Sequence, residues 1–471
     1  MLKHILFSSF DMSTFTLEHL NLNSTGIILL CLTLILFLAT LLKPKYPNKV
    51  FLLDFACHKA PDAQSCSKES VMEQAQHYGK FSDATLDFMH KTLERSGLGE
   101  STYLPEALLR QPPNPCLEEE LKEAEAAMFG VVDKVLAKTG VRGDEIGVLV
   151  VNCCIFNVVP SLSSMIVNRY KLKEDVATYS LQGMGCSAGL CAIGLAKNLL
   201  QVHPNSYALV VSTENITGNA YVGNNRSMTL INCLFRVGGA AILLSNRPSD
   251  AQIAKYKLLH TVHTHTARWG RSYECIFQEE DECGQVGVTI TKDLMAVAID
   301  AIEANVTVLG RLILPVSEQI LYAANWLARL FRMANVEPYM PNFTKAVDHV
   351  FPHVGGKPVL DELQKSLGLS EAHMEASRMT LYRFGNTSSS SIWYALAYAE
   401  AKGRMKRGDR AWQIAFGSGF KCSSVIWEAI RTVGGQETSN PWTDEIDGFP
   451  VATKDIEPIP YFFEPSKKKE V

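Results

Sequence analysis

The sequence contains no C-x-x-C pair and no H-E-x-x-H segment, the strongest sequence signatures of a zinc site. Its twelve cysteines are scattered, and only Cys153 and Cys154 are adjacent. This is not the regular cysteine framework of a small secreted domain stabilised by disulfides. We therefore expect free thiols in a reducing compartment, and we predict that the chain binds no metal ion.

A surplus of positive charge is also absent. The 45 Lys and Arg residues are balanced by 49 Asp and Glu residues, which gives a formal net charge of −4. A protein that binds a phosphate backbone needs a basic surface, so we expect no nucleic-acid partner. The composition, 47% apolar and 20% charged, is typical of a globular chain. A length of 471 residues predicts two packed domains or one fused, duplicated domain.

Long uncharged runs are rare, with one exception near the N-terminus. Residues 26–42 read GIILLCLTLILFLATLL, which is at the short end of what a transmembrane helix needs. Lys43, Lys45 and Lys49 follow at once, so the positive-inside tendency places the downstream body in the cytosol. A signal peptide is the alternative, but the run has no charged start close to it and no clear cleavage site.

The rest of the chain alternates between helical and strand-like patterns. Residues 43–70, rich in Lys, Pro and Cys, are interpreted as a linker, and 117–138 have a helical pattern. Apolar runs typical of buried strands occur at residues 146–151, 207–212, 240–244 and 412–416. The alternation predicts an α/β fold with a buried sheet.

A second apolar stretch lies at residues 309–333, where three arginines are spaced along the sequence. Two interpretations are open. The stretch is either a pair of helices packed on the core or an interfacial segment that dips into a bilayer surface, where an acyl chain could enter.

Cys186 is the strongest candidate for a catalytic residue. It lies in the small-residue segment Gly183–Gly189, directly before a helical pattern. The free N–H groups and the dipole of a helix N-terminus favour a thiolate, the form of cysteine that acts as a nucleophile. The flanking glycines let a thioester approach closely and leave the Cys186 N–H free to bind an oxyanion.

Two further loops carry polar groups that could meet this cysteine. One loop, residues 348–356, contains His353 and precedes a predicted helix at 357–367. The other, residues 383–391, contains Asn386 and a run of hydroxyl residues typical of a helix cap. His353 and Asn386 are 33 positions apart, which leaves room for one helix and one strand, so both loops could reach one site.

At this level of detail the chain resembles the plant 3-ketoacyl-CoA synthases, the condensing enzymes of very-long-chain fatty acid elongation. The resemblance covers roughly residues 43–432. It is carried by the segments GMGCSAGL, SLSSMIVNRYKL, CLFRVGGAAILLSNR, EASRMTL, RFGNTSSSSIWYALAYAEAKGRM and AFGSGFKCSS.

The resemblance implies a thiolase-like, duplicated αβαβα fold, related to chalcone-synthase-like enzymes, with a Cys-His-Asn site formed by Cys186, His353 and Asn386. His265 and His349 match further family histidines, for which a structural role or a role behind the site is favoured. The expected organisation is an N-terminal segment (1–25), a transmembrane helix (26–42), the linker (43–70), a half with the nucleophile (71–250), a half with His and Asn (251–435) and a tail (436–471).

The implied reaction joins an acyl-CoA to malonyl-CoA and releases 3-ketoacyl-CoA, CO2 and CoA. Cys186 accepts the acyl group, while its N–H and a backbone N–H of Gly417 or Gly419 hold the oxyanion. His353 and Asn386 donate to the malonyl thioester oxygen and stabilise the enolate. No cofactor is expected. The implied setting is the endoplasmic reticulum membrane, in lipid metabolism such as cuticular wax synthesis, with a homodimer and other elongase proteins as partners.

One position departs from the family pattern. The family usually reads Leu-His-Arg-Phe-Gly-Asn where this chain has Leu-Tyr-Arg-Phe-Gly-Asn, with Tyr382 in place of the histidine. Tyrosine is a poor base at neutral pH. If this position lies behind the site, the enzyme is complete; if the histidine is essential, the chain is a weak or inactive paralogue that modulates other elongase components. A soluble polyketide synthase is a third hypothesis, disfavoured by the predicted anchor and the detailed motifs.

Overall fold

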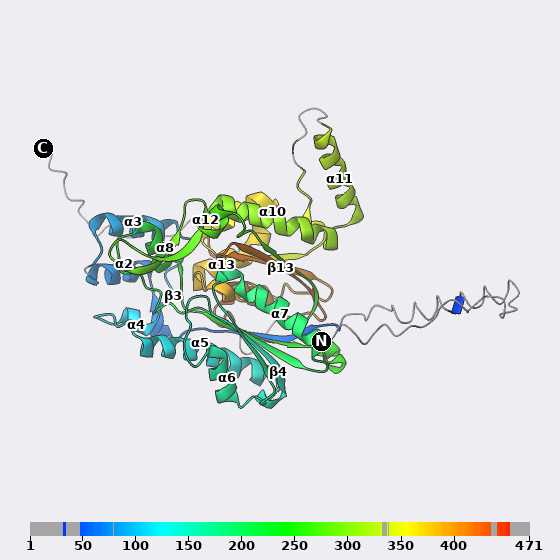
Figure 1. Cartoon of the computed structure of the whole chain (residues 1–471), viewed down its shortest axis with the longest axis horizontal. Helices are drawn as coiled ribbons and strands as arrows, with labels where there is room; N and C mark the ends of the chain where they lie inside the picture. Colours follow the sequence, from blue (N-terminus) through cyan, green and yellow to red (C-terminus); the bar gives the residue numbers. More distant parts are fainter. Residues whose placement is uncertain are drawn as a thin grey trace, which may run out of the picture. The chain divides into compact units, whose positions relative to one another are not determined.

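The computed structural model describes residues 32–33, 48–78, 80–331, 337, 339–434 and 440–452. Within these residues, nine strands form one mixed sheet in the order β11-β12-β13-β8-β1-β7-β6-β4-β5 (Figure 1). They are β1 (Phe51–Cys57), β4 (Ile146–Asn152), β5 (Ala177–Leu181), β6 (Tyr207–Thr213), β7 (Gly239–Ser245), β8 (Tyr256–His265), β11 (His349–Pro352), β12 (Arg410–Gly417) and β13 (Lys421–Ala429). All four predicted strand runs lie inside these strands.

Helices cover the sheet, and two short hairpin-like pairs complete the described fold. The pairs are β2 (Ser65–Cys66) with β3 (Thr102–Tyr103), and β9 (Ile276–Glu280) with β10 (Val286–Ile290). The longer helices are α2 (Lys68–His77), α3 (Asp83–Arg95), α5 (Leu117–Thr139), α6 (Leu162–Tyr170), α7 (Ala188–Val202), α8 (Arg226–Leu234), α10 (Leu294–Ile313), α11 (Val316–Leu330), α12 (Lys357–Leu367), α13 (Glu371–Phe384) and α14 (Ser391–Ala401).

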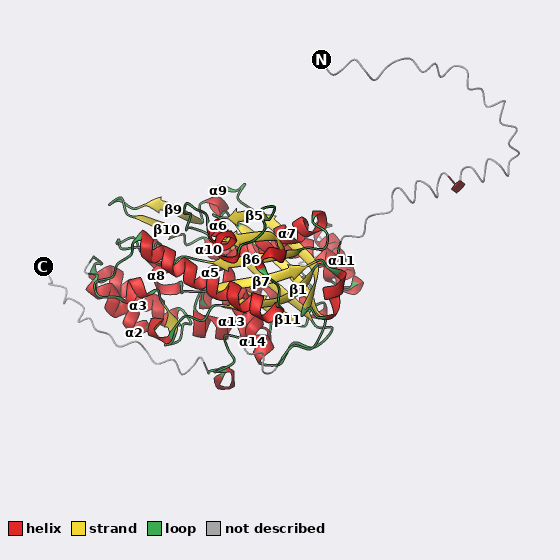
Figure 2. Ribbon diagram, turned by 90° about the horizontal axis from the view of Figure 1, so that it is seen from below, coloured by secondary structure: helices red, strands yellow, loops and turns green. Residues whose placement is uncertain are grey.

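The contacts between elements build five layers (Figure 2). Helices α5 and α6 cover the outer side of β1 and β4–β7. Helix α7 packs on β4 and β6 and also touches β8, β12 and β13, so it lies between the two parts of the sheet. Helix α14 contacts β1, β11 and β12, while α10 and α13 pack on the second part from outside. The predicted αβαβα arrangement is therefore confirmed.

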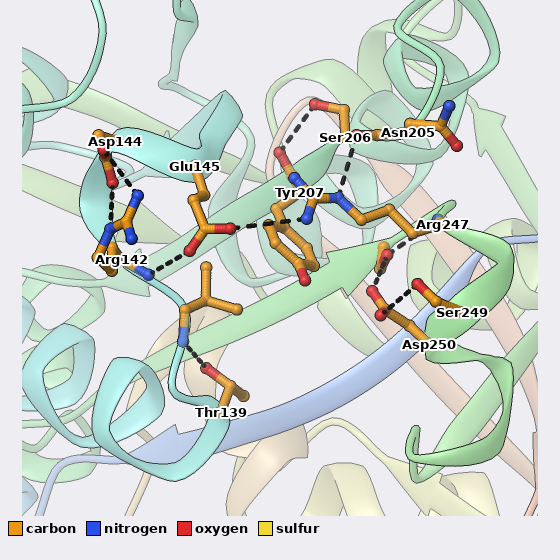
Figure 3. A network of polar contacts seen from close by, with 12 residues as sticks. Thr139, Arg142, Asp144, Glu145, Asn205, Ser206, Tyr207, Arg247, Ser249 and Asp250 are labelled. Atoms are coloured by element: carbon orange, nitrogen blue, oxygen red, sulfur yellow. Dashed lines mark hydrogen bonds and ion pairs between the residues drawn. The ribbon is translucent and has the colours of Figure 1, made fainter.

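The strands of the two predicted halves lie on opposite sides of the β1–β8 junction. The chain crosses from β7 to β8 through a short turn at Pro248–Gln252, which contains the predicted boundary at 250/251. Figure 3 shows how this crossing is held: Arg247 lies over the Tyr207 ring at 3.9 Å, donates to the Asn205 carbonyl at 3.1 Å and pairs with Glu145 at 3.6 Å. The boundary itself stays a prediction.

The linker predicted at 43–70 needs correction. Residues 51–57 form β1, which is buried along its whole length and pairs with β7 on one side and β8 on the other. Composition was misleading here, because Asp54 interrupts the strand and leaves only the three-residue apolar run 51–53 beside Lys- and Pro-rich sequence. The predicted tail at 436–471 also contributes to the core, since Trp442 is fully buried against Phe384 and Tyr398.

The two apolar stretches have different outcomes. Apart from residues 32 and 33, the predicted transmembrane helix at 26–42 lies outside the described residues, and no described helix is long and apolar enough to span a membrane. The stretch at 309–333 divides at Pro315. Its first part ends α10 and packs on the core through Leu309 and Leu314, whereas α11 buries only Glu318.

Candidate active site

Cys186 lies in a single 3-10 turn, Gly185–Ser187, that leads directly into α7. The sequence-based placement before a helix is therefore confirmed. Gly185 has a φ of +57°, in the left-handed region that favours glycine. A side chain there would also meet the backbone nitrogen of Ser418 at 2.6 Å. This glycine allows the cysteine turn and the loop after β12 to touch.

The charge state of Cys186 differs from the prediction. Burial raises the pKa of its thiol to about 12, and the neighbouring Cys154 and Glu214 act in the same direction. A hydrogen bond from the Ser388 hydroxyl, at 3.6 Å, and the Cys186 N–H itself act against this. Burial outweighs the helix N-terminus, so the ligand-free chain holds a thiol at neutral pH. The proton must leave when the acyl substrate binds.

This charge state predicts how Cys186 reacts with an alkylating agent. Below its pKa, the thiolate fraction rises tenfold for each pH unit. Iodoacetamide should therefore modify Cys186 faster at each step from about pH 6 to pH 9, without a plateau. Mass spectrometry of the Cys186 peptide measures the rate. A plateau near pH 7 would show a preformed thiolate and contradict this assignment.

His353 follows β11 and is almost completely buried. Its N–H donates to the Ile414 carbonyl at 2.8 Å, and its ring meets the Phe416 ring edge-on. Nδ1 is hydrogen-bonded to the Ser391 hydroxyl at 3.0 Å, which leaves Nε2 for another partner. Burial lowers the pKa of His353 to about 3, so the imidazole is neutral at physiological pH.

Asn386 comes from the loop between α13 and α14, as predicted. Its backbone N–H donates to the Leu234 carbonyl at 3.1 Å, and its Oδ1 accepts from the Ser388 N–H at 2.9 Å. The amide Nδ2 faces Gly355, two residues beyond His353, at 3.5 Å from its carbonyl. The two polar loops therefore meet at one place. Hydrogen bonds to the backbone of Ser388 and Gly355 orient the side-chain amide of Asn386.

The loop Gly417–Gly419 forms the other wall next to Cys186. A side chain added at Gly417 would lie 2.6 Å from the Cys186 backbone nitrogen and 2.8 Å from the Met184 carbonyl. Gly419 has a φ of +99° and also lines the cavity described below. Gly417 thus lies beside the Cys186 N–H, and Gly419 lines the same cavity as Cys186. Their role as donors stays a prediction.

The close approach at Gly417 predicts a large effect for one methyl group. Gly417→Ala should force the β12 loop away from the Cys186 N–H and lower kcat/KM by at least about a hundredfold. Gly270→Ala is the matched control, because its added side chain meets no atom within 4 Å. Equal activity in the two variants, both folded by circular dichroism, would contradict the placement of the oxyanion site.

Two residues of the site were not singled out from the sequence. The Ser388 hydroxyl lies within hydrogen-bonding distance of both the Cys186 sulfur (3.6 Å) and the Glu214 carboxylate (3.0 Å). Glu214 is buried, which raises its pKa, and it also accepts from the N–H groups of Cys154 and Ile155. The sequence did contain a signal for Glu214, since this carboxylate lies two residues after the predicted strand run 207–212.

The remaining candidates lie outside the cavity that Cys186, His353 and Asn386 share. His349 bonds Asp409 at 2.9 Å at the start of β11, and His265 ends β8 opposite Lys421. Tyr382 packs on Gly99 and makes an edge contact with the ring of Phe449. None of these three side chains lines the cavity.

The cavity itself is large and mainly apolar. It encloses about 670 Å³, within the usual range for small-molecule sites, and Cys186, His353, Asn386, Glu214 and Ser388 lie in its polar part. Its apolar walls come from α3, α8, the β9–β10 pair and the start of α10. They include Phe88, Ile231, Leu234, Phe277, Val288, Leu294 and Met295. Such walls suit a hydrocarbon chain attached at the cysteine.

Comparison with known proteins agrees with this geometry. A family model for FAE1/type III polyketide synthase-like proteins matches residues 42–331, and one for the C-terminal part of 3-oxoacyl-[acyl-carrier-protein] synthase III matches 343–429. The chain is 57% identical to 3-ketoacyl-CoA synthase 2 of Arabidopsis thaliana over 90% of its length and 82% of that protein. It is 54% identical to 3-ketoacyl-CoA synthase 11 of the same plant, covering 94% and 87%.

Solved structures share the fold at lower identity. CsyB complexed with CoA-SH has a TM-score of 0.65 at 21% identity and covers 81% of this chain and 100% of its own. The 1,3,6,8-tetrahydroxynaphthalene synthase of Streptomyces coelicolor, a bacterial type III polyketide synthase, has a TM-score of 0.62 at 19% identity, with coverages of 80% and 99%. From the closer sequence relatives, this chain belongs to the 3-ketoacyl-CoA synthase family.

Proposed function

We propose that this chain condenses a long-chain or very-long-chain acyl-CoA with malonyl-CoA to give 3-ketoacyl-CoA, CO2 and CoA. The observation that carries the proposal is the meeting of Cys186, His353 and Asn386 in one apolar cavity. The names of the close relatives support the same reaction, and nothing among them favours an inactive paralogue.

The first half-reaction loads the cysteine. The proton of Cys186 passes through His353 to the departing CoA sulfur, while the Cys186 sulfur attacks the acyl carbonyl. The carbonyl oxygen gains charge beside the Cys186 N–H and the Gly417–Gly419 loop. The products are an acyl-Cys186 thioester and free CoA, and the neutral imidazole is regenerated.

The second half-reaction makes the new carbon–carbon bond. Malonyl-CoA loses CO2, and the electron pair of the broken bond forms an enolate whose oxygen accepts hydrogen bonds from His353 and Asn386. The enolate carbon attacks the acyl thioester, and the Cys186 sulfur leaves as a thiolate, which takes up a proton from solvent to restore the thiol. The Ser391 hydroxyl can accept from Nδ1 of His353 while Nε2 takes the thiol proton, and it can donate to Nδ1 when the proton resides on Nε2, so it suits both half-reactions. The chain's own groups cover every step, so we propose no cofactor.

The cellular setting is part of the same proposal. The chain is anchored in the endoplasmic reticulum membrane by residues 26–42, its catalytic body faces the cytosol, and it works as a homodimer beside other elongase proteins. A carbonate-washed membrane pellet that retains the chain is the expected result. Release of the chain into the wash would contradict the anchor without affecting the proposed chemistry.

The test of the reaction uses microsomes that contain the full chain. Given labelled malonyl-CoA and a series of acyl-CoA primers, they should form 3-ketoacyl products two carbons longer than the primer. Microsomes without the chain are the control. Failure with every primer, or cyclised products from small aromatic starters, would contradict the proposal.

The position of Tyr382 gives a sharper test of the inactive alternative. Because its ring packs on Gly99 and Phe449 outside the cavity, Tyr382→His should change the elongation rate by no more than about twofold. The rate is measured in microsomes at equal amounts of chain. An inactive wild type that becomes active with histidine would overturn the proposal and establish the paralogue hypothesis.

A further inference from the structure

Helix α11 exposes an apolar surface that the described residues leave uncovered. Figure 1 shows it extending away from the layers of the body. Large side chains along the helix are exposed to solvent over its whole length: Ile320, Leu321, Tyr322, Trp326, Leu327 and Leu330. If this surface of α11 faced water, we would expect charged and polar side chains on it instead of large apolar ones.

The helix is nevertheless held firmly at its base. Glu318 is shielded from solvent, and its carboxylate accepts from the Lys345 ammonium, the Tyr339 hydroxyl (2.7 Å) and the Asn342 N–H (3.0 Å). These contacts, led by Lys345, lower the pKa of Glu318 to about 2. The carboxylate therefore stays ionised at cellular pH and fixes α11 to the segment before β11.

The exposed charged side chains of α11 and of the end of α10 are basic. Between residues 308 and 331, Glu318 is the only acidic residue, and its charge is taken up by Lys345. Arg311 and Arg329 are exposed. An exposed acid, Glu337, lies beside α11, where its backbone carbonyl accepts from the Asn325 amide at 2.9 Å. The surface of α11 itself carries apolar side chains, aromatic rings at Tyr322 and Trp326 and a basic group, and such a surface matches the headgroup region of an anionic bilayer.

The position of α11 in the fold also agrees with contact between this helix and a bilayer. Helix α10 begins at the cavity, where Leu294 and Met295 line it, and carries α11 about 30 Å away at its other end. Figures 1 and 2 both show α11 at the end of the body where β1 starts. In the sequence, residues 43–50 are all that separates the proposed anchor at 26–42 from β1.

We propose that α11 lies in the headgroup region of an anionic bilayer and forms a second membrane contact beside the N-terminal anchor. The inference rests on the proposed membrane location. Two contacts at one end of the body would fix its orientation, and the cavity would keep a constant distance from the membrane. A single anchor cannot provide this.

The test uses the tryptophans of the full chain reconstituted in vesicles of phosphatidylcholine and phosphatidylserine. Trp393, Trp412, Trp427 and Trp442 are fully buried, whereas Trp326 and Trp269 are 53% and 58% exposed. Phospholipids brominated near the headgroup should quench the chain's fluorescence. In Trp326→Phe the quenched fraction should fall at least about threefold, while the matched control Trp269→Phe keeps it.

The other outcomes separate the competing occupants. Equal bromolipid quenching in wild type and Trp326→Phe would overturn the proposal. So would quenching of Trp326 by aqueous acrylamide alone, which means exposure to water. Shielding from both quenchers would mean that a second copy or another part of the chain covers α11, and it overturns the proposal as well. Failure to bind vesicles at all would instead remove the proposed membrane anchor and, with it, this inference.

Discussion

Cys186→Ala should lower the rate of elongation by at least about a thousandfold, because the acyl group then has no sulfur to which it can transfer. The loss should be specific to the first half-reaction. His353 and Asn386 are positioned by Ser391, Gly355 and Ser388 rather than by the Cys186 side chain. The variant should therefore still release CO2 from malonyl-CoA.

The measurement follows both half-reactions in the same membranes. Labelled acyl-CoA reports covalent acyl-enzyme by mass, and carboxyl-labelled malonyl-CoA reports CO2. Cys191→Ala is the matched control, because Cys191 lies on α7 but bonds Ser423 and does not line the cavity. An acyl group found on another cysteine, such as Cys154, in the Cys186→Ala variant would overturn the assignment of the nucleophile.

The layers of the fold could be predicted from sequence because long, buried elements leave strong patterns. The run 207–212 became the fully buried strand β6, and the predicted helix at 357–367 coincides with α12. Residues 51–57 gave a weaker pattern, because Asp54 interrupts the apolar run and the neighbouring residues are polar. Its place beside β7 and β8 depends on pairing with strands almost 200 residues away, which local patterns do not contain.

The candidate site was predictable where chemistry and backbone geometry coincide. The glycines around Cys186 indicated both the turn and its close neighbours, and the structure confirms these contacts at Gly185 and Gly417. The thiolate was not predictable. Its formation depends on the balance between a helix N-terminus and burial, and burial is known only from the tertiary structure.

For Tyr382, the sequence suggested a place at the site that the structure does not confirm. Its sequence position, four residues before Asn386, suggested a place at the site. In the structure α13 ends at Phe384, and the chain turns at Gly385, so the two side chains diverge. Asn386 faces Gly355 inside the cavity, whereas Tyr382 packs outside it. Proximity in sequence across a helix end says little about proximity in space.

His353→Ala should lower the condensation rate by about a hundredfold or more, since one donor to the enolate oxygen is commonly worth about 3 kcal/mol. Asn386→Ala should have a similar effect, and the two losses should not add fully because both donors share one oxygen. Acyl-Cys186 should accumulate in Asn386→Ala, where the loading step keeps its histidine. His349→Gln is the matched control, because His349 bonds Asp409 outside the cavity.

The pH dependence of decarboxylation tests the proposed state of His353 directly. Burial lowers its pKa to about 3, so the neutral form that donates from Nε2 persists at every pH above that value. Release of CO2 by Cys186→Ala should therefore be flat between about pH 5 and pH 8, and should fall only at still lower pH. A rate that instead falls as the pH rises, with a midpoint near 6.5, would mean that His353 is active as a cation. The neutral donor assigned to the second half-reaction would then be wrong.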